Sequence, residues 1–474
     1  MSLRRLTALA VAVLATGCTL GPTHRPPVMP PSAAGAFASE SSTVDPTRDP
    51  PDAWWRLYDD DVLARFVAEA LTANSDLRVA VANLALSQAV LREVKAGRYP
   101  TTQISAGAVY GRNLIADSIA AAFHGHAENQ TTYLGGLDLS YEIDLYGRVT
   151  RSIEAANADT QSIEAARDAI RVAVAAETTR AYASARNASR ELAVAQRSLE
   201  IADEAVAIVV RQAAAGAASE FDVARVQVLA DQARAVIPAF TGRRRAALFE
   251  LAVLLGRAPS DAPIHEAYGG TPMRIEMALP VGDGARLLAR RPDVRQAERR
   301  LAAATARIGV ASASLYPRVS LGANLGLANN DVLKGSNAVN FALGPLISWS
   351  FPNQAVARAR IAQSDAAAAA SLASFDGTVL RALKEVEQSI SACDAEASRR
   401  SALAAAEVNA TKAYRLSGLR QREGALSQLD LLAAEQTLLG ARAALAAADS
   451  RMIDAQISLF KALGGGWRET STPQ

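Results

Sequence analysis

Few side chains in this sequence have the types and spacing needed for chemistry. The 474 residues include two cysteines, Cys18 and Cys393, and four histidines, two of which form His124-Gly125-His126. Two histidines one residue apart could hold a metal ion, but only Glu128 stands nearby as a further ligand, so solvated loop side chains are the simpler interpretation. No phosphate-binding loop, nucleophile elbow or metal-ligand spacing is present. We expect no catalysis, no metal site and no cofactor.

The composition favours long packed helices. Fifty basic residues face 48 acidic ones, which gives a net charge of +2, and half of the residues are hydrophobic although only 5% are aromatic. This near-balance argues against nucleic acid as a partner. Arg243-Arg244-Arg245 lies in a helical pattern, so we expect a solvated or ion-paired face. No run of eighteen uncharged apolar residues occurs, and a membrane-spanning helix is not predicted.

The N-terminus is typical of an exported protein. Residues 1–17 combine a basic start, a short apolar run and small residues before Cys18, as a signal peptide does. Ala15-Thr16-Gly17-Cys18 resembles the bacterial lipoprotein box, which implies that Cys18 is lipidated and anchors the mature chain to outer-membrane lipid. An ordinary secretory signal with an incidental cysteine is the alternative. Prolines in residues 18–52 predict an extended tether, and Cys393 is expected to be a small core residue.

The rest of the sequence contains one unit twice, as residues 53–270 and 271–465, before a tail at 466–474. At a spacing of 217 positions, Asp76, Arg78, Tyr99 and Pro100 recur as Asp293, Arg295, Tyr316 and Pro317. At a spacing of 208 positions, Glu177, Gly216, Ser219, Asp222 and Arg234 recur as Glu385, Gly424, Ser427, Asp430 and Arg442. Ordered matches of this kind indicate an internal repeat.

Two-faced strands follow each Tyr-Pro pair. They are expected at about 101–113, 131–145, 317–328 and 338–351. In the second strand Leu137, Leu139, Tyr141, Ile143 and Leu145 alternate with the polar residues Asp138, Ser140, Glu142 and Asp144. One apolar and one polar face suits either a soluble sandwich or a membrane barrel.

Very long helical hairpins follow the strands. Residues 148–214 contain no proline or glycine and predict a rod of about 100 Å, and a second rod is expected over 353–423. Each returns in a shorter helix, at 219–256 and 428–463. Glycine followed by Ser-x-x-Asp at each tip predicts a left-handed C-cap and a capping box.

Four strands cannot close a barrel, since small closed barrels need about eight. We therefore predict a mainly helical fold in which a homotrimer builds a 12-stranded transmembrane barrel continued by a coiled-coil α-barrel. The apolar strand face would meet lipid, while Asp138, Ser140, Glu142 and Asp144 would line the water-filled lumen.

Four sequence segments resemble those of TolC-like outer membrane factors, in particular the lipoprotein branch that serves resistance-nodulation-division efflux pumps. They are Trp54-Trp55-x-Leu57-Tyr58, Ala70-Leu71-x-x-Asn74-x-Asp76-Leu77, Tyr141-Glu142-Ile143-Asp144-Leu145-Tyr146-Gly147-Arg148 and Leu287-Leu288-Ala289-Arg290-Arg291-Pro292-Asp293-Val294. The resemblance implies a trimeric channel whose tips, at Gly216, Ser219, Asp222, Gly424, Ser427 and Asp430, dock a periplasmic adaptor linked to an inner-membrane pump. Helix capping alone would also explain these residue types.

The sequence departs from the family at the periplasmic entrance, which several members narrow with aspartate rings. Residues 395–429 contain no aspartate. We expect closure through Tyr414, Arg415, Leu416, Arg420 and Arg422, with an acidic cation filter absent or supplied by Glu423. The resulting function is an exit duct for small molecules such as drugs or toxic compounds. An outlet for secreted polypeptide and a periplasmic coiled-coil scaffold are the alternatives.

Overall fold

The computed structural model describes residues 19–29, 31–39, 41–112, 114–126, 128–265, 273–330 and 334–466. The predicted signal peptide, Cys18 and nearly all of the C-terminal tail lie outside them. The fold is mainly helical with few strands, as predicted. It divides into two units. The sheet unit comprises Ala85–Ile163, Ala297–Phe375 and the described residues before Val28, and the hairpin unit comprises Val28–Leu84, Glu164–Gln296 and the described residues from Asp376 onward.

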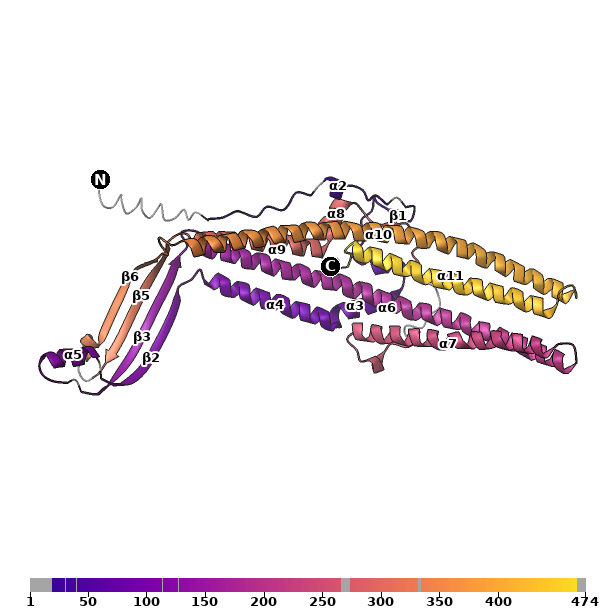
Figure 1. Cartoon of the computed structure of the whole chain (residues 1–474), viewed down its shortest axis with the longest axis horizontal. Coiled ribbons are helices and arrows are strands. Elements are labelled where there is room, and N and C mark those ends of the chain that lie inside the picture. The colour runs from indigo at the N-terminus through magenta and orange to yellow at the C-terminus, as the bar shows by residue number, and fades with distance from the viewer. Residues whose placement is uncertain are drawn as a thin grey trace. The chain divides into compact units, whose positions relative to one another are not determined.

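The sheet unit contains one antiparallel sheet with the strand order β2-β3-β5-β6, visible as four neighbouring arrows in Figure 1. The strands are β2 (Thr101–Gly111), β3 (Gln130–Ile143), β5 (Arg318–Asn329) and β6 (Val339–Ser348). Each lies within a few residues of its predicted bounds, because alternation sets the strands and Tyr-Pro stops the helices that precede β2 and β5. The sheet is open, since β2 and β6 each pair on one side only within the described sheet.

Between β2 and β3 the chain forms a short helix, α5 (Leu114–Ala122), where the sequence pattern predicted only a loop. The η3 turn (Gly335–Ala338) stands between β5 and β6. His124 and His126 follow α5 and are both exposed. The Nδ1 atom of His126 lies 3.8 Å from the Asp117 carboxylate, and the described residues contain no group of three or more potential metal ligands.

Long helices run through both units. They are α4 (Ser75–Ala96), α6 (Arg148–Ala214), α9 (Pro292–Ala313) and α10 (Ala355–Arg422). The bounds of α6 match the prediction at both ends, because no proline or glycine interrupts it and glycines flank it. None of the helices in the described ranges combines the length and apolar character needed to cross a bilayer.

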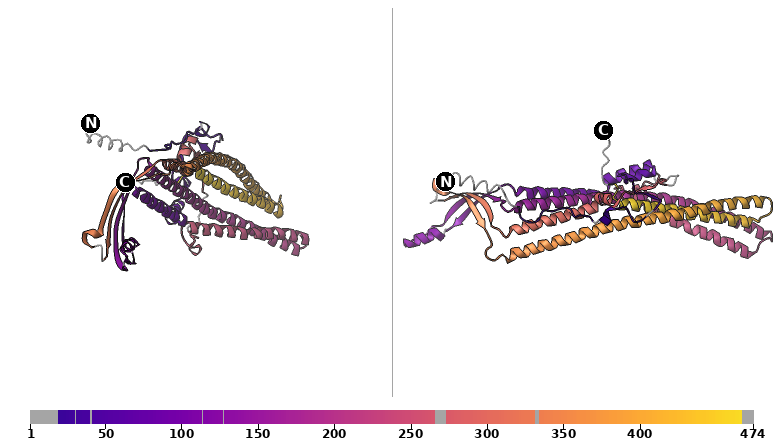
Figure 2. Two further views of the ribbon diagram at one scale, coloured as in Figure 1. Left: turned by 60° about the vertical axis from the view of Figure 1, so that its left-hand side comes forward. Right: turned by 90° about the horizontal axis from the view of Figure 1, so that it is seen from above.

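The hairpin unit holds the return helices and the main core. Its remaining elements are α2 (Pro31–Ala34), β1 (Val44–Asp45), η1 (Trp54–Tyr58), α3 (Asp61–Ala73), α7 (Glu220–Leu254), η2 (Pro259–Asp261), β4 (Leu279–Pro280), α8 (Gly284–Arg290) and α11 (Gln428–Ala462). Figures 1 and 2 show α7 running back along the end of α6, and α11 along α10. The fully buried Trp54 stacks on Phe460 of α11 with ring centroids 4.9 Å apart. Cys393 is buried in the same core.

The predicted tether is extended for most of its length, but it is held to the rest of the chain. In the hairpin unit β1 pairs in parallel with β4. The backbone amides of Ala38 and Ser39 donate to the Glu387 carboxylate over 2.7 and 2.9 Å. These contacts join residues about 350 positions apart in the sequence, which local patterns could not reveal.

Candidate channel surfaces and hairpin tips

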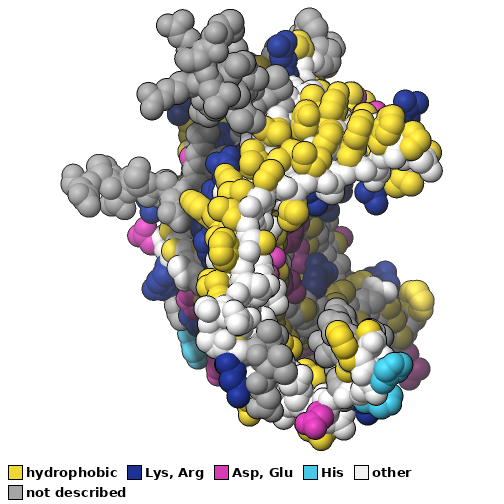
Figure 3. Space-filling model, turned by 90° about the vertical axis from the view of Figure 1, so that its left-hand side faces the viewer, with side chains coloured by type: hydrophobic (Ala, Val, Ile, Leu, Met, Phe, Trp, Pro, Cys, Tyr) yellow, Lys and Arg dark blue, Asp and Glu magenta, His cyan; other side chains and the backbone are white. Residues whose placement is uncertain are grey.

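The register of the sheet gives it one apolar and one polar face. Ile104, Leu137, Leu325 and Phe341 are aligned across the four strands and therefore lie on the same face. Ile104 is 83% exposed and Phe341 is 81% exposed. Figure 3, viewed from the side on which Figure 1 draws the sheet, shows hydrophobic side chains gathered in a broad band. Such a large exposed apolar surface on a sheet marks a surface that meets lipid or another chain.

The opposite face is polar and lined by small residues. Asp138 and Ser140 lie on it, and the Asn324 side-chain amide donates to the Asp138 carboxylate over 2.7 Å. A concave region of about 690 Å³ runs along these strands, lined in part by Gly322 and Gly344. Two of the predicted lumen residues thus share a hollowed polar face.

Glu142 and Asp144 lie at the junction between β3 and α6. The Glu142 carboxylate accepts two hydrogen bonds from the Arg148 guanidinium, over 2.7 and 2.6 Å. Asp144 lies beyond the end of β3, and its carboxylate accepts from the backbone amides of Val149 and Thr150. These are the free amides of a helix start, which a carboxylate satisfies and whose dipole it complements. Asp144 therefore caps α6, where alternation had placed it on the strand.

Both hairpin tips in the hairpin unit have the predicted left-handed glycine and serine N-cap, and the first tip also has the reciprocal bond of a capping box. Gly216 has φ +75° and Gly424 has φ +73°, the left-handed conformation that glycine adopts without strain. The Ser219 hydroxyl accepts from the Asp222 amide, and the Asp222 carboxylate accepts from the Ser219 amide in return. The bond from Ser219 lowers the pKa of Asp222. Ser427 accepts from the Asp430 amide in the same way, over 3.1 Å.

The side chains at the tips face solvent in this chain. Gly216, Ser219, Gly424, Ser427 and Asp430 are exposed, and Asp222 is partly exposed. Phe221, next to the first cap, is 73% exposed. A large aromatic side chain left in water beside a rigid turn is suited to a partner surface.

The predicted entrance residues divide into two kinds. Arg415, Leu416, Arg420 and Arg422 are exposed on the last turns of α10. Tyr414 is half-buried, and burial together with the neighbouring Glu435 carboxylate raises its pKa. Glu435 lies on α11, 3.8 Å from the Arg197 guanidinium of α6, so the polar contacts of Tyr414 link one hairpin to the other.

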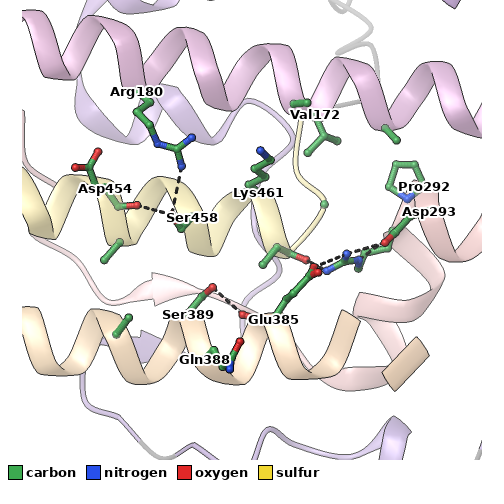
Figure 4. A pocket seen from close by; sticks show the side chains of 17 residues that line it. Val172, Arg180, Pro292, Asp293, Glu385, Gln388, Ser389, Asp454, Ser458 and Lys461 are labelled. Atoms are coloured by element: carbon green, nitrogen blue, oxygen red, sulfur yellow. Dashed lines mark hydrogen bonds and ion pairs between the residues drawn. The ribbon is translucent and has the colours of Figure 1, made fainter. Parts of the chain in front are cut away.

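A second polar site, which no sequence pattern predicted, lies further along the hairpin unit. Arg291 is 7% exposed and donates to Asp293, to Glu385 and to the Ala462 carbonyl oxygen. A cavity of about 670 Å³ opens beside it, shown in Figure 4 with Arg180, Asp454 and Lys461. The sequence signals were the Arg-Arg-Pro-Asp segment and the recurrence of Glu177 as Glu385, but nothing in the sequence joined the two, because Glu385 is 94 positions from Arg291.

Comparison with known proteins decides the family. The model of the outer membrane efflux protein family matches residues 66–257 and 285–465. The chain belongs to this family. Its sequence is 30% identical to outer membrane protein OprJ of Pseudomonas aeruginosa over 470 residues, which cover 98% of this chain and 96% of that protein. It is 29% identical to the toluene efflux pump outer membrane protein TtgI of Pseudomonas putida, with 98% and 99% covered.

The structure gives the same assignment. The outer-membrane channel OprN matches with a TM-score of 0.84 and 33% identity, over 95% of this chain and all of that chain. As an outer membrane efflux protein, the chain acts in efflux at the outer membrane, and the family is one of channels and not of enzymes.

Proposed function

We propose that three copies of this outer membrane efflux protein form a passive exit duct, with a 12-stranded transmembrane barrel above a periplasmic α-barrel. The observation that carries the proposal is the sheet of the sheet unit, which has a polar face, an apolar face and two outer strands, β2 and β6. Backbone groups exposed to hydrocarbon must be paired, and three such sheets joined edge to edge would close the ring.

The repeated architecture supports the same assembly. The helices α6 and α10 have 67 and 68 residues, and the return helices α7 and α11 have 35 each. Because each chain has two equivalent hairpins, a trimer would contain six hairpins, arranged with near-sixfold symmetry. We infer that the chain arose as a duplicated unit, with repeats at 53–270 and 271–465.

The partners follow from the tips and from the relatives. We infer that a periplasmic adaptor docks at Gly216, Ser219 and Asp222 and at Gly424, Ser427 and Asp430, and that an inner-membrane resistance-nodulation-division pump supplies the energy. Phe221 gives the first tip an exposed apolar side chain, and Leu429 occupies the equivalent position in the sequence of the second tip. The relative named for toluene efflux supports small toxic molecules as the cargo.

The periplasmic entrance would close through Tyr414, Arg415, Leu416, Arg420 and Arg422. Because residues 395–429 contain no aspartate, divalent and trivalent cations should block the channel weakly. Single-channel currents of the purified protein test this, and strong block would contradict the assignment. Glu423→Gln then shows whether Glu423 forms an acidic ring, because it would abolish any block that the wild type displays.

The decisive experiment measures mass and conductance together. The mature protein in detergent should have the mass of three chains and should open water-filled pores in planar bilayers. A stable monomer without conductance would favour the scaffold alternative.

Deleting the gene should raise the accumulation of toxic small molecules without lowering polypeptide secretion, and the reverse result would favour the secretion outlet.

A further inference from the structure

The first described residues of the chain lie in a fitted site at the base of the sheet unit. The amide of Leu20 donates to the Tyr146 carbonyl oxygen over 3.3 Å, next to the junction of β3 and α6. The His24 ring lies 2.6 Å from the Glu298 carboxylate of α9. Residues 19–24 are therefore held at both ends by groups that lie more than 100 positions away in the sequence.

Arg151 forms the centre of this site. It is 4% exposed, and its guanidinium donates to the carbonyl oxygens of Leu20 and Gly21 over 3.0 and 3.1 Å. A third contact of 2.7 Å joins it to Glu154, the next turn of α6. A buried guanidinium must satisfy its donors, and here the N-terminal segment supplies three acceptors, the two carbonyl oxygens and the Thr23 hydroxyl at 3.4 Å. Removing that segment would leave the Arg151 guanidinium without these acceptors.

Close backbone approach fixes the position of the segment. A Cβ atom on Gly309 would lie 2.7 Å from the Leu20 carbonyl oxygen, and one on Gly21 would lie 2.5 Å from the Gly309 Cα. Gly21 also has φ +82°, which disfavours any other residue. The fit requires glycine on both the helix and the segment, so it is specific for this stretch of chain.

We propose that Arg151 and Gly309 form a docking site for residues 19–24, which holds the lipidated N-terminus at the base of the sheet. The role of the lipid rests on the acylation of Cys18 that the resemblance to a lipoprotein box implies, whereas the docking of residues 19–24 does not depend on it. Because Thr19 directly follows Cys18, the acyl chains would enter the bilayer at one fixed place beside the start of α6. The lipid anchor would then set the depth of the sheet in the membrane instead of acting as a flexible tether.

The test places a nitroxide spin label at Arg25→Cys in the full mature protein. Arg25 is exposed, Cys393 is buried and Cys18 would be blocked by acylation, so the label reports from residue 25 alone. The wild-type background should give a slow, immobilised spectrum. Arg151→Ala and Gly21→Ala should each give a several-fold faster label. Arg307→Ala, which removes only an exposed contact of α9 with Asp159, should leave the spectrum unchanged.

Gly21→Ala and one further variant, Cys18→Ser, distinguish loss of docking from failure of assembly and from loss of the lipid. Gly21→Ala changes the segment and not the packed helices, so it decides the question if Arg151→Ala does not assemble. Cys18→Ser should keep the label immobilised, with Cys393 still inaccessible, since docking needs no lipid. An unchanged spectrum in both Arg151→Ala and Gly21→Ala would overturn the docking site. Absence of conductance with an immobilised label would instead count against the proposed channel alone.

Discussion

The Arg291 guanidinium lies 2.8 Å from the Glu385 carboxylate and joins the end of α8 to α10 within the hairpin unit. The same guanidinium donates over 2.8 Å to the Ala462 carbonyl oxygen at the end of α11. One buried side chain thus connects three helices. Burial disfavours its charge, but the bonds to Asp293 and Glu385 outweigh that effect and raise the pKa of Arg291.

Arg291→Gln should destabilise the hairpin unit by about 3 kcal/mol, because it leaves two carboxylates and a carbonyl oxygen without their donor. Thermal unfolding followed by circular dichroism of the detergent-solubilised protein measures the loss. Arg286→Gln is the matched control, since Arg286 is exposed and pairs with Asp49 at the surface. Equal effects of the two substitutions would contradict a special role for Arg291.

Asp454, beside the same cavity, should make the protein less stable as the pH rises. Burial raises its pKa even though Arg180 opposes the shift. The folded state therefore keeps this proton where the unfolded state has lost it, so stability falls between the ordinary carboxyl pKa and the raised one. Asp454→Asn should remove that loss and raise the unfolding temperature at pH 7. Asp365→Asn, at an exposed position on α10, should not.

Asp293 should show the opposite dependence. Burial acts to raise its pKa, but the hydrogen bond and charge of Arg291 outweigh burial and lower it. The stabilisation is complete above the ordinary carboxyl pKa and is lost as the pH falls through the lowered one. Asp293→Asn should therefore lose stability at pH 7 but little at pH 2. A uniform loss at both pH values would mean that packing, and not charge, is what the substitution removes.

Adjacent residues of β5 provide a matched test of the two sheet faces. Leu325→Arg places a charge on the apolar face, which should cost about 2–4 kcal/mol at the middle of a bilayer and deplete the protein from the outer membrane fraction. Asn324→Arg places the same charge on the polar face and should leave insertion intact. Loss of both variants would argue that the barrel interior is too narrow for arginine, and retention of both would contradict the lipid-facing assignment.

Substitution of Ser219 separates capping from adaptor contact. Ser219→Ala should destabilise the tip by about 1 kcal/mol, whereas Ser219→Asp keeps a capping acceptor. Binding of the adaptor to the purified channel, followed by surface plasmon resonance, distinguishes the two roles. If capping alone matters, Ser219→Asp should bind as the wild type does and Ser219→Ala should bind more weakly. Equal weakening in both would assign a direct contact to the hydroxyl.

Local patterns predicted the long elements well. The bounds of α6, the strands and the tip caps follow from proline, glycine and alternation, all of which act over a few residues. Asp144 was misplaced because alternation carried the strand on to residue 145, although the helix predicted from Arg148 needs a capping acceptor just before its start. Residues such as Arg151, whose partners lie 130 positions away, give no periodic signal. Their roles come from tertiary packing.

The outer strands β2 and β6 also have a consequence before assembly. A newly exported subunit would present unsatisfied amides and carbonyls beside exposed Ile104 and Phe341, the combination that drives indiscriminate strand addition. The unassembled subunit is thus prone to aggregate before it reaches the outer membrane. We expect its delivery to depend on escort by holding chaperones, and its accumulation to provoke an envelope stress response.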